Sequence, residues 1–133
     1  MPMPDKGQML ETIHAALAAR QRGDMDSIHQ FLAPAATFRL VGAPEAPKVP
    51  LGYSDARGAV SDLIELFEFH AIEPVHTVVE GHVAVVHWHV RASTGGGEQF
   101  ATELCDIWTF DDDGKIKSVV EFADTAKMAQ MLA

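Results

Sequence analysis

The strongest constraint on the fold comes from the second half of the chain, which reads as a series of strands joined by short turns. Apolar and polar residues alternate there, as they do in strands with one buried face. The connecting sequences TGGGE and DDDG are glycine-rich, which favours hairpin turns, and Glu80-Gly81 is a further turn signal. The strands are expected at residues 72–79, 83–92, 99–110 and 115–122.

Helices are predicted to fill most of the first half. Leu10, Ile13 and Leu17 recur at helical spacing, and Gly23 ends that first helix. The further elements are expected to be a helix from Asp24 to Pro34, a strand at 37–41, a proline-rich loop from 42 to Ser54, a helix from Ser54 or Asp55 to near His70, and a short helix after Asp124.

This order of elements predicts an α+β fold in one domain spanning residues 1–133. A curved antiparallel sheet wrapped by the N-terminal helices forms a cone, a cystatin-like roll. The interior of such a cone is too wide for side chains alone to fill. A mostly apolar cavity with a few polar groups is a typical binding site for small molecules.

Composition limits the partners. The formal net charge of −9 argues against nucleic-acid binding and against docking on an anionic membrane surface. Cys105 is the only cysteine, which excludes an intrachain disulfide and a cysteine-based zinc site and fits a reducing cytoplasm. We find no signal peptide and no apolar stretch of membrane-spanning length, and expect a cytoplasmic protein.

Asp106 is the residue that does not fit its strand. Alternation places it on the same face as Leu104, Trp108 and Phe110, which look like core. An apolar setting raises the pKa of a carboxyl group, which can then act as a general acid or base near neutral pH. The structural alternative is that a helix N–H or another side chain satisfies the carboxylate. We take Asp106 as the first catalytic candidate.

Glu121 lies on the neighbouring strand and is the second catalytic candidate. If the DDDG hairpin turns its face inward, Glu121 and Asp106 line one cavity, and two close carboxylates push their pKa values apart. The alternative is a solvent-facing charge, because Lys117 on the same face looks exposed.

His87 and His89 form an H-x-H pair on one strand face, an arrangement that suits a metal site or a proton relay. No third ligand can be placed from the sequence, and the opposite face, which carries Trp88, is the more apolar. We therefore expect the histidines on the outer face and predict no metal site and no cofactor. The register of strand 83–92 decides between the two faces.

The closing run CDIWTFDDDGKIKSVVEFADTAKM and the earlier run GDMDSIHQFLAPAATFRLVG carry a family resemblance. Both resemble the nuclear transport factor 2-like superfamily, in its SnoaL-like and ketosteroid-isomerase-like branch, and the order of elements between them agrees. The resemblance implies a conical small-molecule pocket and a homodimer formed through the outer sheet face. The scaffold hosts many reactions and many non-enzymes, so the resemblance implies no single activity.

Residue by residue, the resemblance carries over in part. Asp106 takes the position of the pocket carboxylic acid of the steroid isomerases, whereas Leu40 and Ala16 stand where those enzymes have a base and an oxyanion-hole tyrosine. Glu121 takes the position of a pocket aspartate in limonene-epoxide-hydrolase-like members. The Arg and Asp that complete the site of those members align with Trp88 and Val90 here, so that site is also incomplete. True steroid isomerisation is therefore not expected.

Three hypotheses remain open. In the first, the protein is a cofactor-independent isomerase, cyclase, dehydratase or epoxide hydrolase that acts on a small apolar molecule. In the second, it is a non-catalytic ligand-binding or accessory module. In the third, side chains fill the cavity and the outer sheet face mediates only dimerisation. The predicted pocket-lining residues are Leu40, Leu63, Phe67, Trp88, Leu104, Trp108, Phe110 and Val119.

Overall fold

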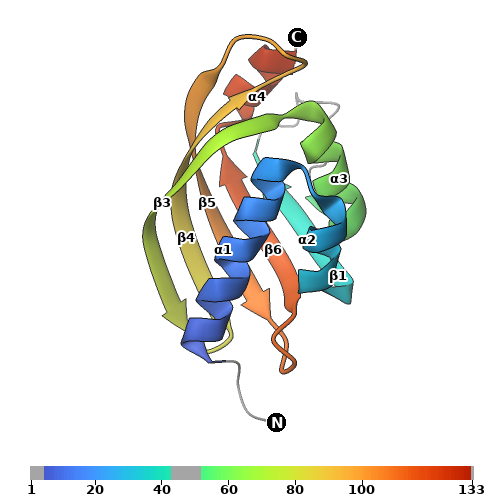
Figure 1. The fold of residues 1–133 in the computed structure, drawn as a ribbon, viewed down its shortest axis with the longest axis vertical. Coiled ribbons are helices and arrows are strands. Elements are labelled where there is room, and N and C mark those ends of the chain that lie inside the picture. Colours follow the sequence, from blue (N-terminus) through green and yellow to red (C-terminus); the bar gives the residue numbers. More distant parts are fainter. Residues whose placement is uncertain (1–4, 43–51, 133) are drawn as a thin grey trace.

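The computed structural model describes residues 5–42 and 52–132 and has the predicted α+β fold (Figure 1). Its helices are α1 (Lys6–Arg22), α2 (Met25–Phe31), α3 (Ala56–Leu66) and α4 (Thr125–Leu132). Its strands are β1 (Leu32–Val41), β2 (Gly52–Asp55), β3 (Glu68–Glu80), β4 (Val83–Ser93), β5 (Phe100–Phe110) and β6 (Ile116–Ala123).

The strands form one mixed sheet in the order β2-β1-β6-β5-β4-β3. The meander β3 to β6 is antiparallel, as predicted, but β1 pairs with β6 in parallel. This parallel pair was not expected, because the two strands come from opposite ends of the chain and no local turn fixes their relative direction. It places β1 in the wall of the cone.

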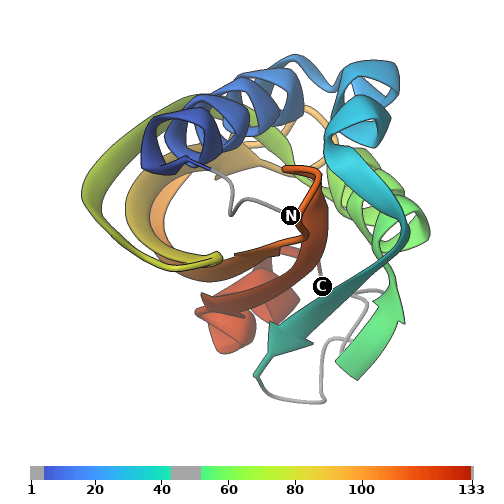
Figure 2. The ribbon, with the colours of Figure 1, turned by 90° about the horizontal axis from the view of Figure 1, so that it is seen from below.

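Seen end-on, the sheet bends into an arc and α1 lies across its concave side (Figure 2). Helix α1 packs on β3 and on α2, while α3 packs on β1. The concave faces of β4 and β5 supply much of the core, and they include the buried residues Ala84, Val86, Trp88, Val90, Leu104, Trp108 and Phe110. The predicted cone is confirmed.

Short side-chain caps fix where three helices begin, as the sequence predicts. An aspartate before each helix accepts a hydrogen bond from a backbone N–H three residues later, which satisfies a group that the first turn leaves free. These caps are Asp24 to Ser27 at 3.2 Å, Asp55 to Gly58 at 2.9 Å and Asp124 to Lys127 at 3.0 Å. Helix α1 ends at Gly23 with a φ of 69°, a left-handed conformation that favours glycine.

Helix α3 ends at Leu66, earlier than the predicted end near His70. Phe67 takes an extended conformation, and β3 begins directly after it. The ring of Phe69 packs edge-on against Trp88, with ring centroids 5.8 Å apart, and this contact favours the strand over a further helical turn.

Two other boundaries differ from the prediction. Strand β1 begins at Leu32 and includes Pro34, which was expected to end a helix. The predicted proline-rich loop lies largely outside the described residues, and its last part, from Gly52, is strand β2. In the described part of the chain, no helix is long and apolar enough to cross a membrane.

Candidate active site

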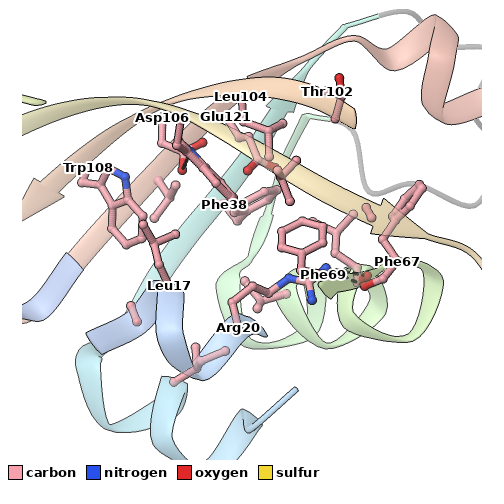
Figure 3. A pocket seen from close by; sticks show the side chains of 18 of the residues that line it. Leu17, Arg20, Phe38, Phe67, Phe69, Thr102, Leu104, Asp106, Trp108 and Glu121 are labelled. Atoms are coloured by element: carbon pink, nitrogen blue, oxygen red, sulfur yellow. Dashed lines mark hydrogen bonds between the residues drawn. The ribbon is translucent and has the colours of Figure 1, made fainter. Parts of the chain in front are cut away.

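A cavity of about 110 Å³ lies between the concave face of the sheet and the helices (Figure 3). One water needs only ~10–15 Å³ of such space, so the cavity has room for a small molecule. Its walls are mainly aliphatic and aromatic side chains. The polar side chains among them are Arg20, Thr102, Asp106 and Glu121, together with the indole N–H groups of Trp88 and Trp108.

Asp106 lies in the cavity wall and is only 2% exposed. Strand β5 points its side chain inward because Leu104 and Trp108, two positions away on either side, also face the core. The indole N–H of Trp88 donates to Oδ2 of Asp106 at 2.9 Å. Trp88 therefore orients one carboxyl oxygen and leaves the other available.

Two buried polar atoms in this wall have no hydrogen-bond partner among the described residues. They are Oδ1 of Asp106 and Nε1 of Trp108. A buried polar group without a partner costs about 1–3 kcal/mol, so such atoms usually mark a place for water or for a ligand. The two atoms suit an oxygen that accepts hydrogen bonds from both, provided that Asp106 is protonated.

Glu121 enters the same cavity from strand β6, directly opposite Asp106 in the β5–β6 ladder. One extra residue, Lys117, interrupts this ladder and is exposed. The bulge shifts the alternation, so that Ile116, Val119 and Glu121 all face inward while Lys117 does not. The exposed appearance of Lys117 therefore says nothing about the direction of Glu121.

Arg20 brings a positive charge to the cavity from the last turn of α1. Its guanidinium donates to the backbone carbonyls of Leu63 at 3.1 Å and Phe67 at 2.9 Å, and it lies 3.7 Å from the centre of the Phe69 ring. Burial lowers the pKa of Arg20 to about 10, with an opposing effect from Glu121. Arg20 is thus still charged at neutral pH.

Burial and mutual repulsion set the protonation of the two carboxyl groups. Burial first, and then the negative charge of Glu121, raise the pKa of Asp106 well above its ordinary value of 3.8. Burial also raises the pKa of Glu121, but its contact with Asp106 and the charge of Arg20 oppose this rise. Asp106 is therefore the group that holds a proton, and Glu121 is the group that ionises first.

The residues singled out from the sequence are placed as follows. Asp106 and Glu121 face one another in the cavity, as Figure 3 shows. Six of the predicted pocket-lining residues line it, namely Leu63, Phe67, Trp88, Leu104, Trp108 and Val119. The other two, Leu40 and Phe110, are buried in the core but do not line the cavity.

Sequence reasoning missed several residues of this wall, of which Arg20 matters most. The signal was present, because Arg20 continues the apolar stripe of Ile13 and Leu17 along α1. A charge on the buried stripe of a helix is unusual and marks a candidate site. Phe38 and Phe69 also line the cavity, but the first depends on the unexpected β1–β6 pairing.

His87 and His89 lie on the convex face of the sheet, away from the cavity. Trp88 between them is buried and lines the cavity, so the expected orientation of strand 83–92 is confirmed. The H-x-H pair and the carboxyl pair therefore occupy opposite faces of one sheet.

The two carboxyl groups are placed to donate and accept protons in the wall of a mainly apolar cavity. A neutral carboxyl group, Asp106, lies beside one that ionises more readily, Glu121, and an indole N–H points to the same space. Pairs of titratable groups whose environments push their pKa values apart are how enzymes divide acid and base roles.

Comparison with known proteins agrees with this fold. The SnoaL-like domain family matches residues 13–119. An NTF2-like protein of unknown function from Burkholderia pseudomallei is similar in structure, with a TM-score of 0.77 and 18% identity, over 95% of this chain and 98% of that one. A protein from Jannaschia sp. CCS1 described as a SnoaL-like polyketide cyclase has a TM-score of 0.77 and 16% identity, over 100% and 97%.

A third similar structure is that of TerC co-crystallised with polyporic acid. It has a TM-score of 0.76 and 16% identity, over 94% of this chain and 98% of that one. No curated protein is a significant match for the sequence. At such low identities the solved structures show the fold alone. The match to the family covers most of the chain and therefore shows which family the chain belongs to. The chain therefore belongs to the SnoaL-like domain family.

Proposed function

We propose that this protein binds a small, largely apolar molecule with an oxygen function, and that Asp106 acts on that molecule as a general acid. The observation that carries the proposal is the pair of unpartnered atoms, Oδ1 of Asp106 and Nε1 of Trp108, in a mainly apolar wall. A ligand carbonyl, hydroxyl or epoxide oxygen can accept from both atoms at once. The similar structures of a polyketide cyclase and of a polyporic acid complex agree with such a ligand.

Glu121 is the proposed base. Asp106 gives its proton to the ligand oxygen, and Glu121 takes a proton from the substrate or from an attacking water. Because the two carboxyl groups face one another, the proton can then pass from Glu121 to Asp106 and restore the starting state. Isomerisation, cyclisation, dehydration and epoxide opening each need one group that donates a proton and one that accepts a proton. The pair of Asp106 and Glu121 therefore suits all four reactions.

A non-catalytic ligand-binding module is the second candidate. Leu40 and Ala16 support it, since neither supplies a chemical group at the positions where steroid isomerases have a base and a tyrosine, and Leu40 lies outside the cavity. The two candidates share the binding step and differ in turnover. Conversion of a bound compound separates them.

Intrinsic fluorescence can test the binding step, because both tryptophans of the chain line the cavity. Titration with cyclic ketones, alcohols and epoxides should change the emission. Hydrocarbons of the same shape should bind about fivefold to tenfold more weakly, since they leave the two polar atoms unpaired. Leu104→Trp, which fills the cavity, should abolish the response to the ligands. Equal affinity for ketone and hydrocarbon would contradict the proposed role of these atoms.

We also propose that two copies pair through the convex face of the sheet. The described residues leave large apolar side chains exposed there, including Val78 at 63% and Phe122 at 43%. Sedimentation at rising concentration should show a dimer, and Phe122→Asp should shift it to a monomer, whereas His14→Asp on α1 should not. A monomer at every concentration would contradict this proposal.

A cytoplasmic location is likewise proposed, on the basis of the single cysteine.

A further inference from the structure

Three histidines and a glutamate come together on the convex face of the sheet, on the side opposite the cavity. Nε2 of His87 lies 2.7 Å from Oε1 of Glu103, and Nε2 of His89 lies 3.1 Å from the same oxygen. The Nδ1 atoms of His76 and His87 are 3.1 Å apart. Three neighbouring strands supply these residues: β3 gives His76, β4 gives the H-x-H pair and β5 gives Glu103.

We propose that His87, His89 and Glu103 bind a divalent transition-metal ion of the zinc type on this face. Imidazole nitrogen and carboxylate oxygen are common ligands of Zn²⁺, at about 2.0–2.2 Å, and two histidines with one carboxylate make a three-ligand set with an open fourth position. The three ligand atoms already lie within 4.8 Å of one another. The sequence alone supplies the histidine pair, and the register of β4 against β5 supplies the third ligand.

The ligand side chains must adjust their positions to accept the ion. Ligand atoms at about 2.1 Å from a tetrahedral Zn²⁺ are about 3.4 Å apart, and the two distances to Glu103 are somewhat shorter than that. The Glu103 side chain is 62% exposed, so it can move outward by a rotamer change without disturbing the core.

His76 supplies the outer partner that metal-bound histidines usually have. The rings of His76 and His87 lie side by side, with ring centroids 5.4 Å apart and planes within 7°. When Nε2 of His87 binds an ion, the ring proton must be on Nδ1, and Nδ1 then donates to Nδ1 of His76. This hydrogen bond fixes the tautomer and the orientation of the ligand. His76 is therefore a positioning residue rather than a ligand.

Other charges around the site are compatible with a cation. Glu73 lies opposite His89 on β3 and lines the same shallow hollow, which also includes Arg91 and Glu103. The two carboxylates outweigh the single arginine, and Glu73 can reach the open coordination position by way of a water. The site shares no residue with the cavity, so this inference does not rest on the proposed ligand binding or acid catalysis.

Calorimetric titration of the tag-free, chelator-treated protein with Zn²⁺ tests the proposal. We expect one ion per chain and a rise in the unfolding temperature on addition of Zn²⁺. His87→Ala and His89→Ala should each weaken binding by more than tenfold and remove the thermal shift. His76→Ala should keep the stoichiometry but weaken binding by about 10–100-fold, the usual effect of losing an outer partner. Bound Co²⁺ should show the visible absorption of a tetrahedral N/O site.

A matched control is His82, which lies 2.9 Å from Asp112 and so forms a histidine–carboxylate pair without a second imidazole. His82→Ala should leave Zn²⁺ affinity unchanged. Unchanged affinity in both His87→Ala and His89→Ala would overturn the proposal, as would an equal loss in His82→Ala. The substituted side chains are all partly exposed, so the variants should fold, and their unfolding temperature without metal checks this.

Discussion

Asp106→Asn should reduce turnover by about 10²–10⁴-fold on any substrate that the wild-type protein converts, because it removes the proposed general acid. The change is nearly isosteric. The amide oxygen of Asn can still accept the hydrogen bond from Trp88, and its NH₂ group, in the place of Oδ1, can donate to the ligand oxygen as the carboxylic O–H does. Binding, measured by tryptophan fluorescence, should therefore change little while the rate falls.

A fall in the turnover rate without a fall in ligand affinity would be specific for the loss of the proton donor. Asp113→Asn removes an exposed carboxylate from the β5–β6 turn and should leave both quantities as in the wild type. If Asp106→Asn binds the ligand normally and converts it at the wild-type rate, Asp106 is not the acid. If no bound compound is converted by the wild type, the non-catalytic candidate holds.

The free energy of unfolding of the wild type should decrease as the pH rises from 5 to 8, by up to about 1.4 kcal/mol per pH unit. Asp106 and Glu121 both have raised pKa values in the folded state, from ordinary values of 3.8 and 4.5. The folded protein therefore holds a proton that the unfolded chain has already lost at pH 5. Stability from such a group is complete below its unfolded pKa and is lost as the pH rises through the folded pKa.

Asp106→Asn should flatten this decrease, because the pair then has only one ionisable member. Denaturant unfolding at several pH values measures the effect. Asp24 and Glu103 have lowered pKa values and act in the opposite direction, but their contribution is complete by about pH 5–6 and is the same in both proteins. Arg20 does not titrate in this range. Parallel curves for wild type and variant would show that Asp106 ionises in the folded protein as it does in the unfolded chain.

Local patterns were enough to predict the part of the site that one hairpin builds. The DDDG turn sets the register of β5 against β6, and simple alternation then places Asp106 on the core side. Alternation along β4 likewise placed Trp88 inward and the two histidines outward. These predictions depend only on residues close in sequence, for which the strand period is a sufficient guide.

The remainder of the site depends on contacts between distant segments. The apolar stripe of α1 marks Arg20 as buried, but only the crossing of α1 over the concave face places its side chain in the cavity. Alternation broken by the Lys117 bulge left the direction of Glu121 open. Glu103 joins the histidines only through the β4–β5 register, so a metal-ligand set could not be assembled from the H-x-H motif alone.

The parallel pairing of β1 with β6 also determines when the cavity can exist as the chain is made. Phe38 pairs with Val119, and Leu40 with Glu121, so this ladder can close only after β6 has been synthesised. Such non-local pairing is slow, because a long loop must be ordered before its contacts contribute. Until then β6 lacks its β1 neighbour, and the cavity lacks the part of its wall that β1 supplies, including Phe38. The cavity that contains Asp106 is therefore complete only when β1 meets β6.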